Sequence, residues 1–90
     1  MKMKAEGLKA GVPDLVLPVA RFPYHGLFLE MKAPGKYPSS EQKWWRDALQ
    51  ARAYRWQLCR SGTAGITTIC AYLGIDRAGK AYVATEGGEP

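Results

Sequence analysis

Two carboxylates and a lysine are the residues of this chain best suited to do chemistry. Asp14 follows the letters GVP, and further along the chain reads Glu30-Met31-Lys32. Carboxylate oxygens are the ligands that Mg²⁺ and Mn²⁺ prefer, and the backbone carbonyl of Met31 would add another. A metal held there would polarise a phosphate and lower the pKa of a bound water, while Lys32 would orient that water or neutralise developing negative charge. The pattern indicates metal-dependent cleavage of phosphodiesters, provided that these residues converge.

The same residues also have a plain structural interpretation. A Glu–Lys pair on a solvated strand face contributes only about 0–1 kcal/mol, and this spacing occurs in many unrelated sequences. Glu30, however, lies inside an otherwise apolar segment, GLFLEM. An acidic residue there is costly without a partner or a metal, so its context favours a site over a surface ion pair.

Two expected strands bring these residues to one end of a sheet. Residues 14–20 form an apolar run that predicts a buried strand, and the proline within it argues for an edge position or a strand end. Residues 26–32 predict a second strand, in which Glu30 and Lys32 share one face because side chains alternate. If the strands pair as a hairpin, the start of one meets the end of the other, and Asp14 lies beside Glu30.

The remaining pattern predicts one α/β domain, with a small mixed β-sheet flanked by helices. Its core spans about 4–73, and 74–90 form a C-terminal tail. The further elements are a helix over 39–53, a strand over 54–60, a helix over 62–73, the tail of a helix over 1–9 and a weak strand over 81–85. The helix over 39–53 is expected to have Arg46 on its solvent-facing side and an apolar side made of Trp44, Trp45, Ala48 and Leu49. The apolar side of the helix over 62–73 is expected to be Ile66, Ile69, Cys70 and Leu73.

Charge is unevenly distributed along the chain, whose formal net charge is +5. Through Arg60 the sequence has eleven Lys and Arg against five Asp and Glu, so the acidic motif lies within the cationic part. A basic domain of this size often meets nucleic acid, although ordinary solubilising charge explains the balance equally well. The candidates for contact with a nucleic acid are Lys36, Tyr37, Lys43 and Arg46.

The two cysteines and the lack of a long apolar run suggest where the protein works. Cys59 and Cys70 each lie in an apolar segment without metal-ligand spacing, so we interpret both as buried free thiols. Free thiols suit a reducing compartment. No run approaches the roughly 18 apolar residues of a membrane span, and no apolar segment follows the basic N-terminus. We therefore expect a cytoplasmic protein with no membrane partner.

Three segments together resemble the VRR-NUC family of the PD-(D/E)XK nuclease superfamily. They are residues 9–17 (KAGVPDLVL), 26–35 (GLFLEMKAPG) and 40–45 (SEQKWW). The resemblance covers about residues 4–73 and implies a restriction-endonuclease-like core with Mg²⁺ or Mn²⁺ as cofactor. By position, it implies that Asp14 and Glu30 are metal ligands, that Lys32 is the catalytic lysine and that Gln42 is a site residue carried by a helix.

Gln42 also has a competing local interpretation. With Ser39 at the N-cap, Gln42 is the N3 residue of a capping box, SSEQ. We expect one rotamer to serve only one of the two roles, and the resemblance favours the role in the site.

The chain departs from the family pattern at its start. Members usually carry an upstream helix with a glutamate, and a strand, before the aspartate, whereas here only Glu6 precedes Asp14 as an acidic residue. We do not expect Glu6 to take that position, which would leave a single-metal site or require a partner subunit.

The resemblance also implies a substrate and an assembly. The family includes stand-alone domains of phages and bacteria and the nuclease domain of the Fanconi-anaemia-associated DNA-repair nuclease. Stand-alone members resemble homodimers that act on branched DNA such as four-way (Holliday) junctions. The leading hypothesis is therefore a structure-specific, metal-dependent DNA endonuclease. The alternatives are a catalytically weak or inactive domain that binds DNA or scaffolds a partner and, less favoured, a basic interaction domain with no role in nucleic-acid binding.

Overall fold

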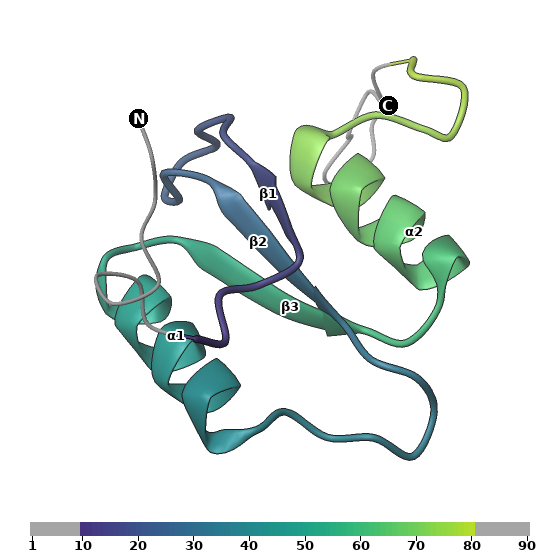
Figure 1. The fold of residues 1–90 in the computed structure, drawn as a ribbon. Helices are drawn as coiled ribbons and strands as arrows, with labels where there is room; N and C mark the ends of the chain where they lie inside the picture. Colours follow the sequence, from purple (N-terminus) through teal and green to yellow (C-terminus); the bar gives the residue numbers. More distant parts are fainter. Residues whose placement is uncertain (1–9, 81–90) are drawn as a thin grey trace, which may run out of the picture.

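Three strands and two helices make up the computed structural model, which describes residues 10–80. In chain order they are β1 (Leu15–Leu17), β2 (Leu27–Met31), α1 (Ser40–Ala51), β3 (Arg55–Cys59) and α2 (Gly62–Leu73). This order confirms the expected mixed α/β fold, and the two helices lie on either side of the sheet (Figure 1). The expected helix over 1–9 and strand over 81–85 lie outside the described residues.

The sheet has the order β1-β2-β3, with β2 in the centre. β1 pairs antiparallel with β2, as expected of a hairpin, and Leu15 is opposite Leu29. β2 pairs parallel with β3, with Glu30 opposite Leu58, and α1 forms the crossover between them. This arrangement places the start of β1 and the end of β2 at the same end of the sheet.

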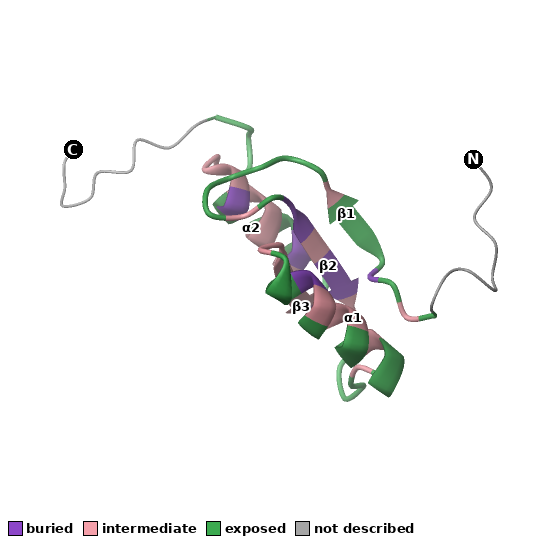
Figure 2. Cartoon of the chain, turned by 90° about the vertical axis from the view of Figure 1, so that its left-hand side faces the viewer, coloured by how far each residue is buried: buried purple, intermediate pink, exposed green. Residues whose placement is uncertain are grey.

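β1 is shorter and more exposed than the sequence predicts. It ends at Leu17 because Pro18 has no N–H with which to continue the ladder. Leu15 and Val16 are about half exposed, so the expectation of a buried strand is wrong. The physical reason is that α2 packs against β2 and β3 rather than over this edge strand. The contrast between exposed β1 and buried β2 is visible in Figure 2.

Strand alternation in β2 separates an apolar face from the face that carries the acid. Leu27 and Leu29 are buried in a core cluster with Cys59 and Tyr72, against which Met31 also packs. Glu30 lies on the opposite face and contacts α1 through Gln42. The expected division of the strand is therefore confirmed.

The helix ends follow local signals, but their side-chain faces agree with the sequence only in part. Ser39 caps α1, and Ser61 and Gly74 cap the two ends of α2, where the glycine is left-handed. Trp44 is 50% exposed and Ile66 is 48% exposed, so placing both on core faces is wrong. A three-stranded sheet whose edge strand has only three residues does not cover the whole apolar stripe of each helix.

The cysteines and the helices bear on the expected cellular environment of the protein. Both cysteines are free; Cys59 is buried, but Cys70 is only half-buried, so that part of the expectation is wrong. Within residues 10–80, neither helix combines the length and the apolar character needed to cross a bilayer.

Candidate active site

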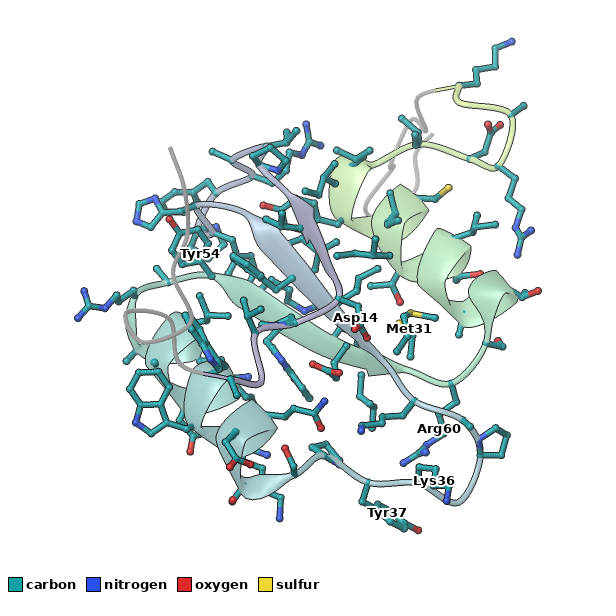
Figure 3. All side chains as sticks on the ribbon, viewed as in Figure 1. Asp14, Met31, Lys36, Tyr37, Tyr54 and Arg60 are labelled. Carbon is teal, nitrogen blue, oxygen red and sulfur yellow. The ribbon has the colours of Figure 1, made fainter. Side chains whose placement is uncertain are left out.

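Asp14 and Glu30 meet at the end of the β1–β2 hairpin. The register that pairs Leu15 with Leu29 continues to place Asp14 opposite Glu30 on the same face. The Oδ2 atom of Asp14 accepts a hydrogen bond of 2.8 Å from the backbone N–H of Met31. Figure 3 shows Asp14 and Met31 close together at the end of β2. The hairpin therefore brings both carboxylates to one place, and a backbone donor orients the first of them.

Glu30 is the buried member of this pair. Its side chain is 1% exposed, and its Oε2 atom accepts a hydrogen bond of 2.9 Å from the Nε2 group of Gln42. Its Oε1 atom is buried and has no hydrogen-bond partner among the described residues. A buried carboxylate oxygen without a partner costs free energy, which points to a cation or a proton as what it accommodates.

The pKa of Glu30 reflects this environment. It is raised from 4.5 to about 7, and the largest cause is burial, because the low-dielectric surroundings disfavour the charged form. The negative charge of Asp14 contributes to this rise, as does a hydrogen bond that the protonated form can make to Asp14. The ammonium of Lys32 opposes these effects and lowers the pKa. Asp14, Glu30 and Lys32 are thus close enough to interact electrostatically.

Gln42 belongs to the helix cap and contacts the acidic pair at the same time. Its Oε1 atom accepts from the backbone N–H of Ser39 at 2.8 Å, and its own N–H donates to the Ser39 hydroxyl at 3.1 Å. Its Nε2 group meanwhile donates to Glu30. The expectation that one rotamer serves only one role is wrong, because the two ends of an amide point in different directions and carry different groups.

A glycine upstream of Asp14 allows the chain to lie against the first turn of α1. Gly11 has a φ of +95°, and a Cβ there would lie only 2.7 Å from the Cβ and the carbonyl carbon of Glu41. Trp45 holds the same segment by donating its Nε1–H to the carbonyl of Ala10 at 3.1 Å. The sequence pattern suggested no role for Gly11 in the site, although a glycine three residues before Asp14 was a signal of a close backbone approach.

The four candidates for nucleic-acid contact lie in two places. Lys36 and Tyr37 are exposed in the loop between β2 and α1. Lys43 is exposed on α1, whereas Arg46 is half-buried, with its Nε 2.8 Å from Asp47 and its guanidinium 5.9 Å from the centre of the Trp56 ring. The expectation that Arg46 lies on a wet helix face is therefore wrong in part, because Trp56 covers it.

The donors at this site fit a divalent ion that prefers oxygen ligands. Within residues 10–80 no group of three or more His, Cys, Asp and Glu side chains gathers in one place, so two carboxylates form the acidic set. Glu30 supplies a buried oxygen without a partner. In a strand, the C=O and N–H of one residue point the same way, so the carbonyl of Met31 is directed to the side where its N–H meets Asp14. Two carboxylates, one carbonyl and water make a ligand set that suits a hard ion.

Comparison with known proteins agrees with this geometry. The family model for the VRR-NUC domain matches residues 1–63. A solved structure described as a VRR_NUC domain protein is 31% identical, with a TM-score of 0.72 over 86% of this chain and 67% of its own. No curated protein sequence matches the chain. The chain therefore belongs to the VRR-NUC family, and its fold is that of a nuclease domain of the PD-(D/E)XK superfamily.

Proposed function

We propose that this protein is a divalent-metal-dependent endonuclease that hydrolyses phosphodiester bonds in branched DNA. The observation that carries the proposal is the Asp14–Glu30 pair. One member is oriented by a backbone N–H, and the other is buried, with one oxygen held by Gln42 and one without a partner. Such a pair is costly in the folded domain unless it serves a positively charged ligand.

The ligands of the ion would be Asp14, Glu30 and the carbonyl of Met31. Mg²⁺ or Mn²⁺ bound there supplies Lewis acidity toward the phosphate and a water of lowered pKa. Gln42 fixes the plane of the Glu30 carboxylate through its 2.9 Å hydrogen bond, so that Oε1 stays directed away from the amide. Asp14 is fixed in the same way by Met31. The chain thus holds its donors in place before the ion arrives.

Lys32 would act on the substrate from the same strand face. It follows Glu30 by two positions, and its charge already affects the pKa of that carboxyl. An ammonium on the same strand face as Glu30 neutralises negative charge that develops on the phosphate, and it orients the attacking water.

Contacts with the DNA backbone would come from Lys36, Lys43 and Arg46, with Tyr37 beside them. Lys36 and Lys43 are exposed and can reach phosphates directly. A guanidinium carries five N–H donors, and Asp47 engages only the Nε group of Arg46. These contacts release counterions, so binding weakens as the salt concentration rises.

A homodimer would place two sites for paired cuts in a four-way junction. In support, edge strand β1 exposes Leu15 and Val16, which also line an apolar pocket of about 120 Å³. Analytical ultracentrifugation at several concentrations tests this assembly, and a monomer at every concentration would contradict it.

The experiment that tests the activity is a substrate panel with Mn²⁺: single strand, duplex, flap and four-way junction. We expect the wild type to cut branched DNA, and Glu30→Gln and Lys32→Ala each to lose cutting by about a hundredfold or more. Glu41→Gln is the matched control, because Glu41 is an exposed carboxylate on α1 outside the pair. DNA cutting that persists in Glu30→Gln or in the presence of EDTA would contradict the metal-dependent mechanism.

A second candidate is a domain that binds DNA without cutting it. The observation that favours it is the set of two carboxylates, rather than three, among residues 10–80. Calorimetric titration with Mn²⁺ separates the two functions. Retained DNA affinity with no metal binding at millimolar concentration supports the binding domain, and metal binding that Glu30→Gln abolishes supports the nuclease.

A further inference from the structure

The chain reverses direction directly after the candidate catalytic lysine. The N–H of Lys36 donates to the carbonyl of Ala33 at 3.1 Å, which closes a tight turn. Pro34 and Gly35 occupy its central positions, and Gly35 has a φ of +81°. Proline followed by a glycine with positive φ is the pattern of a type II turn, which has a defined shape. The loop that leaves β2 therefore begins with an ordered turn.

An arginine that directly follows the neighbouring strand β3 holds this turn. Nη1 of Arg60 donates to the carbonyl of Ala33 at 3.0 Å and to the carbonyl of Lys36 at 2.6 Å. Arg60 lies directly after β3, where the N–H of Lys32 donates to the carbonyl of Cys59 at 3.0 Å and extends the strand pairing. Hydrogen bonds from a charged donor are stronger than neutral ones. Arg60 thus fixes both ends of the turn to the end of the sheet.

The same guanidinium lies over the ring of Tyr37. Its Cζ atom is 5.1 Å from the ring centre, a distance at which the positive charge attracts the face of the ring. Tyr37 nevertheless remains 73% exposed. Figure 3 shows the side chain of Arg60, which follows β3, beside Lys36 and Tyr37 on the loop beyond β2, while Tyr54 lies at the opposite end of the sheet. A large aromatic ring is therefore held in place, and mostly exposed, on the loop beyond the end of the sheet that carries the acidic pair.

A fixed and exposed ring suits one kind of DNA feature. Aromatic side chains stack on nucleobases, and a base offers its face only where it is unpaired or at the end of a helix. A continuous duplex keeps those faces covered by neighbouring base pairs. A ring that is already oriented also loses little conformational freedom when a base stacks on it.

We propose that Tyr37 is a stacking platform for an unpaired base at the branch point of the bound DNA, and that Arg60 is the residue that positions it. This inference rests on the proposed function, since it names the substrate feature that the site selects. Tyr37 favours branch points and flaps over continuous duplex, and Arg60 acts through the turn and the ring without touching the DNA.

The test uses the full chain and junctions that carry 2-aminopurine at an unpaired position by the branch. Stacking on an aromatic ring quenches its fluorescence, and anisotropy reports binding separately, with EDTA present so that nothing is cut. We expect quenching with the wild type and with Tyr37→Phe, and its loss with Tyr37→Leu. We also expect Tyr37→Leu to lower the preference for junction over duplex by about tenfold, because that preference arises from the stacking of the unpaired base on the ring.

Arg60 is tested in the same assay. Arg60→Ala should reduce the quenching in a domain that circular dichroism shows to be still folded, and Arg60→Lys, which can still donate to both carbonyls, should recover part of the quenching. Arg52→Ala is the matched control, because Arg52 is an exposed arginine at the end of α1. If Arg60→Ala leaves the quenching unchanged, Arg60 does not position the ring.

The outcomes separate this inference from the nuclease. Quenching that depends on Tyr37, in a protein that never cuts DNA, supports the platform and contradicts the nuclease. Cutting with the same junction preference in Tyr37→Leu supports the nuclease and overturns the platform. Bound junction without quenching also overturns the platform, and absence of any DNA binding overturns both.

Discussion

Glu30 is the residue whose environment differs most from that of an ordinary surface acid. In the unfolded chain its pKa is near 4.5, and in the folded domain it is about 7. The folded state therefore binds the proton more tightly, so the free energy of unfolding falls as pH rises from 4.5 through about 7 and stays low above it. In the absence of metal, the decrease amounts to about 3 kcal/mol.

Replacing Glu30 by glutamine tests this linkage. Glu30→Gln keeps the shape of the side chain and an acceptor for Gln42 but removes the titration. In EDTA, we expect the melting temperature of the wild type to fall relative to Glu30→Gln between about pH 5 and pH 8. Adding Mn²⁺ at the higher pH should restore the wild type alone. The melting temperature of Glu41→Gln should depend on pH as that of the wild type does. The same pH dependence in the wild type and in Glu30→Gln would show that the pKa of Glu30 is not raised by folding.

Gln42 combines two roles that the variants Ser39→Ala and Gln42→Ala separate. Ser39→Ala removes the hydroxyl that accepts from the helix N–H, at a cost of about 1 kcal/mol, but leaves the amide on Glu30. Gln42→Ala removes the other half of the capping box, the Oε1 acceptor for the Ser39 N–H, together with the contact with Glu30. We expect similar loss of stability in denaturant unfolding, but a tenfold or greater additional loss of cutting only in Gln42→Ala. Equal cutting by the two variants would show that the contact with Glu30 has no role in catalysis.

At the scale of elements, the site depends on the contact between the segment before β1 and the first turn of α1. Gly11 permits that contact because its φ is positive and because no space exists for a Cβ. Ser39 caps α1, whose first turn faces the same segment, and the hairpin register then fixes where Asp14 falls. The helix and the hairpin therefore have to be placed correctly relative to each other for the carboxylates and the amide to meet.

A Gly11→Ala substitution tests this arrangement. It adds strain from the positive φ and a clash with the backbone of Glu41, so we expect destabilisation of about 2–3 kcal/mol and reduced metal affinity. Gly79→Ala is the control, since its φ is also positive but no atom lies within 4 Å of its Cβ. Denaturant unfolding and calorimetry measure the two effects. A Gly11→Ala protein as stable as Gly79→Ala would exclude a tight contact there.

At the scale of the whole molecule, positive charge surrounds a small acidic site. The formal net charge is +5, and Lys36 and Lys43 are exposed on the loop and helix that flank the Glu30–Gln42 contact. The cationic surface attracts a polyanion, while the acidic pair repels phosphate until a cation occupies it. Affinity for DNA and the ability to cut it are thus expected to respond differently to salt and to metal.

The salt dependence of DNA binding tests the first part of this expectation. Removing one lysine that binds a phosphate should make the slope of log K against log salt shallower by about 0.9. We expect Lys36→Ala and Lys43→Ala each to show this change in fluorescence anisotropy. Lys80→Ala is the control, because Lys80 is an exposed lysine beyond α2. A slope that changes equally in all three variants would mean that the charge acts in general rather than through particular phosphates.

Local features of the sequence determined much of the fold. The capping residues around Ser39, Ser61 and Gly74 specify helix ends because they satisfy nearby backbone groups. Strand alternation alone placed Glu30 and Lys32 on one face, because it depends only on backbone geometry. The hairpin also followed from two apolar runs that succeed each other along the chain.

Only the tertiary structure decided which of those residues act together. Gln42 reaches Glu30 while it caps α1, and Arg60 reaches the loop after Lys32, because β3 and α1 pack beside β2. The exposure of Ile66 likewise depends on how far the sheet extends under α2. Residue types and spacing thus determined which groups could do the chemistry. Distances between segments far apart in the chain, and the burial that raises the pKa of Glu30, arise only from packing.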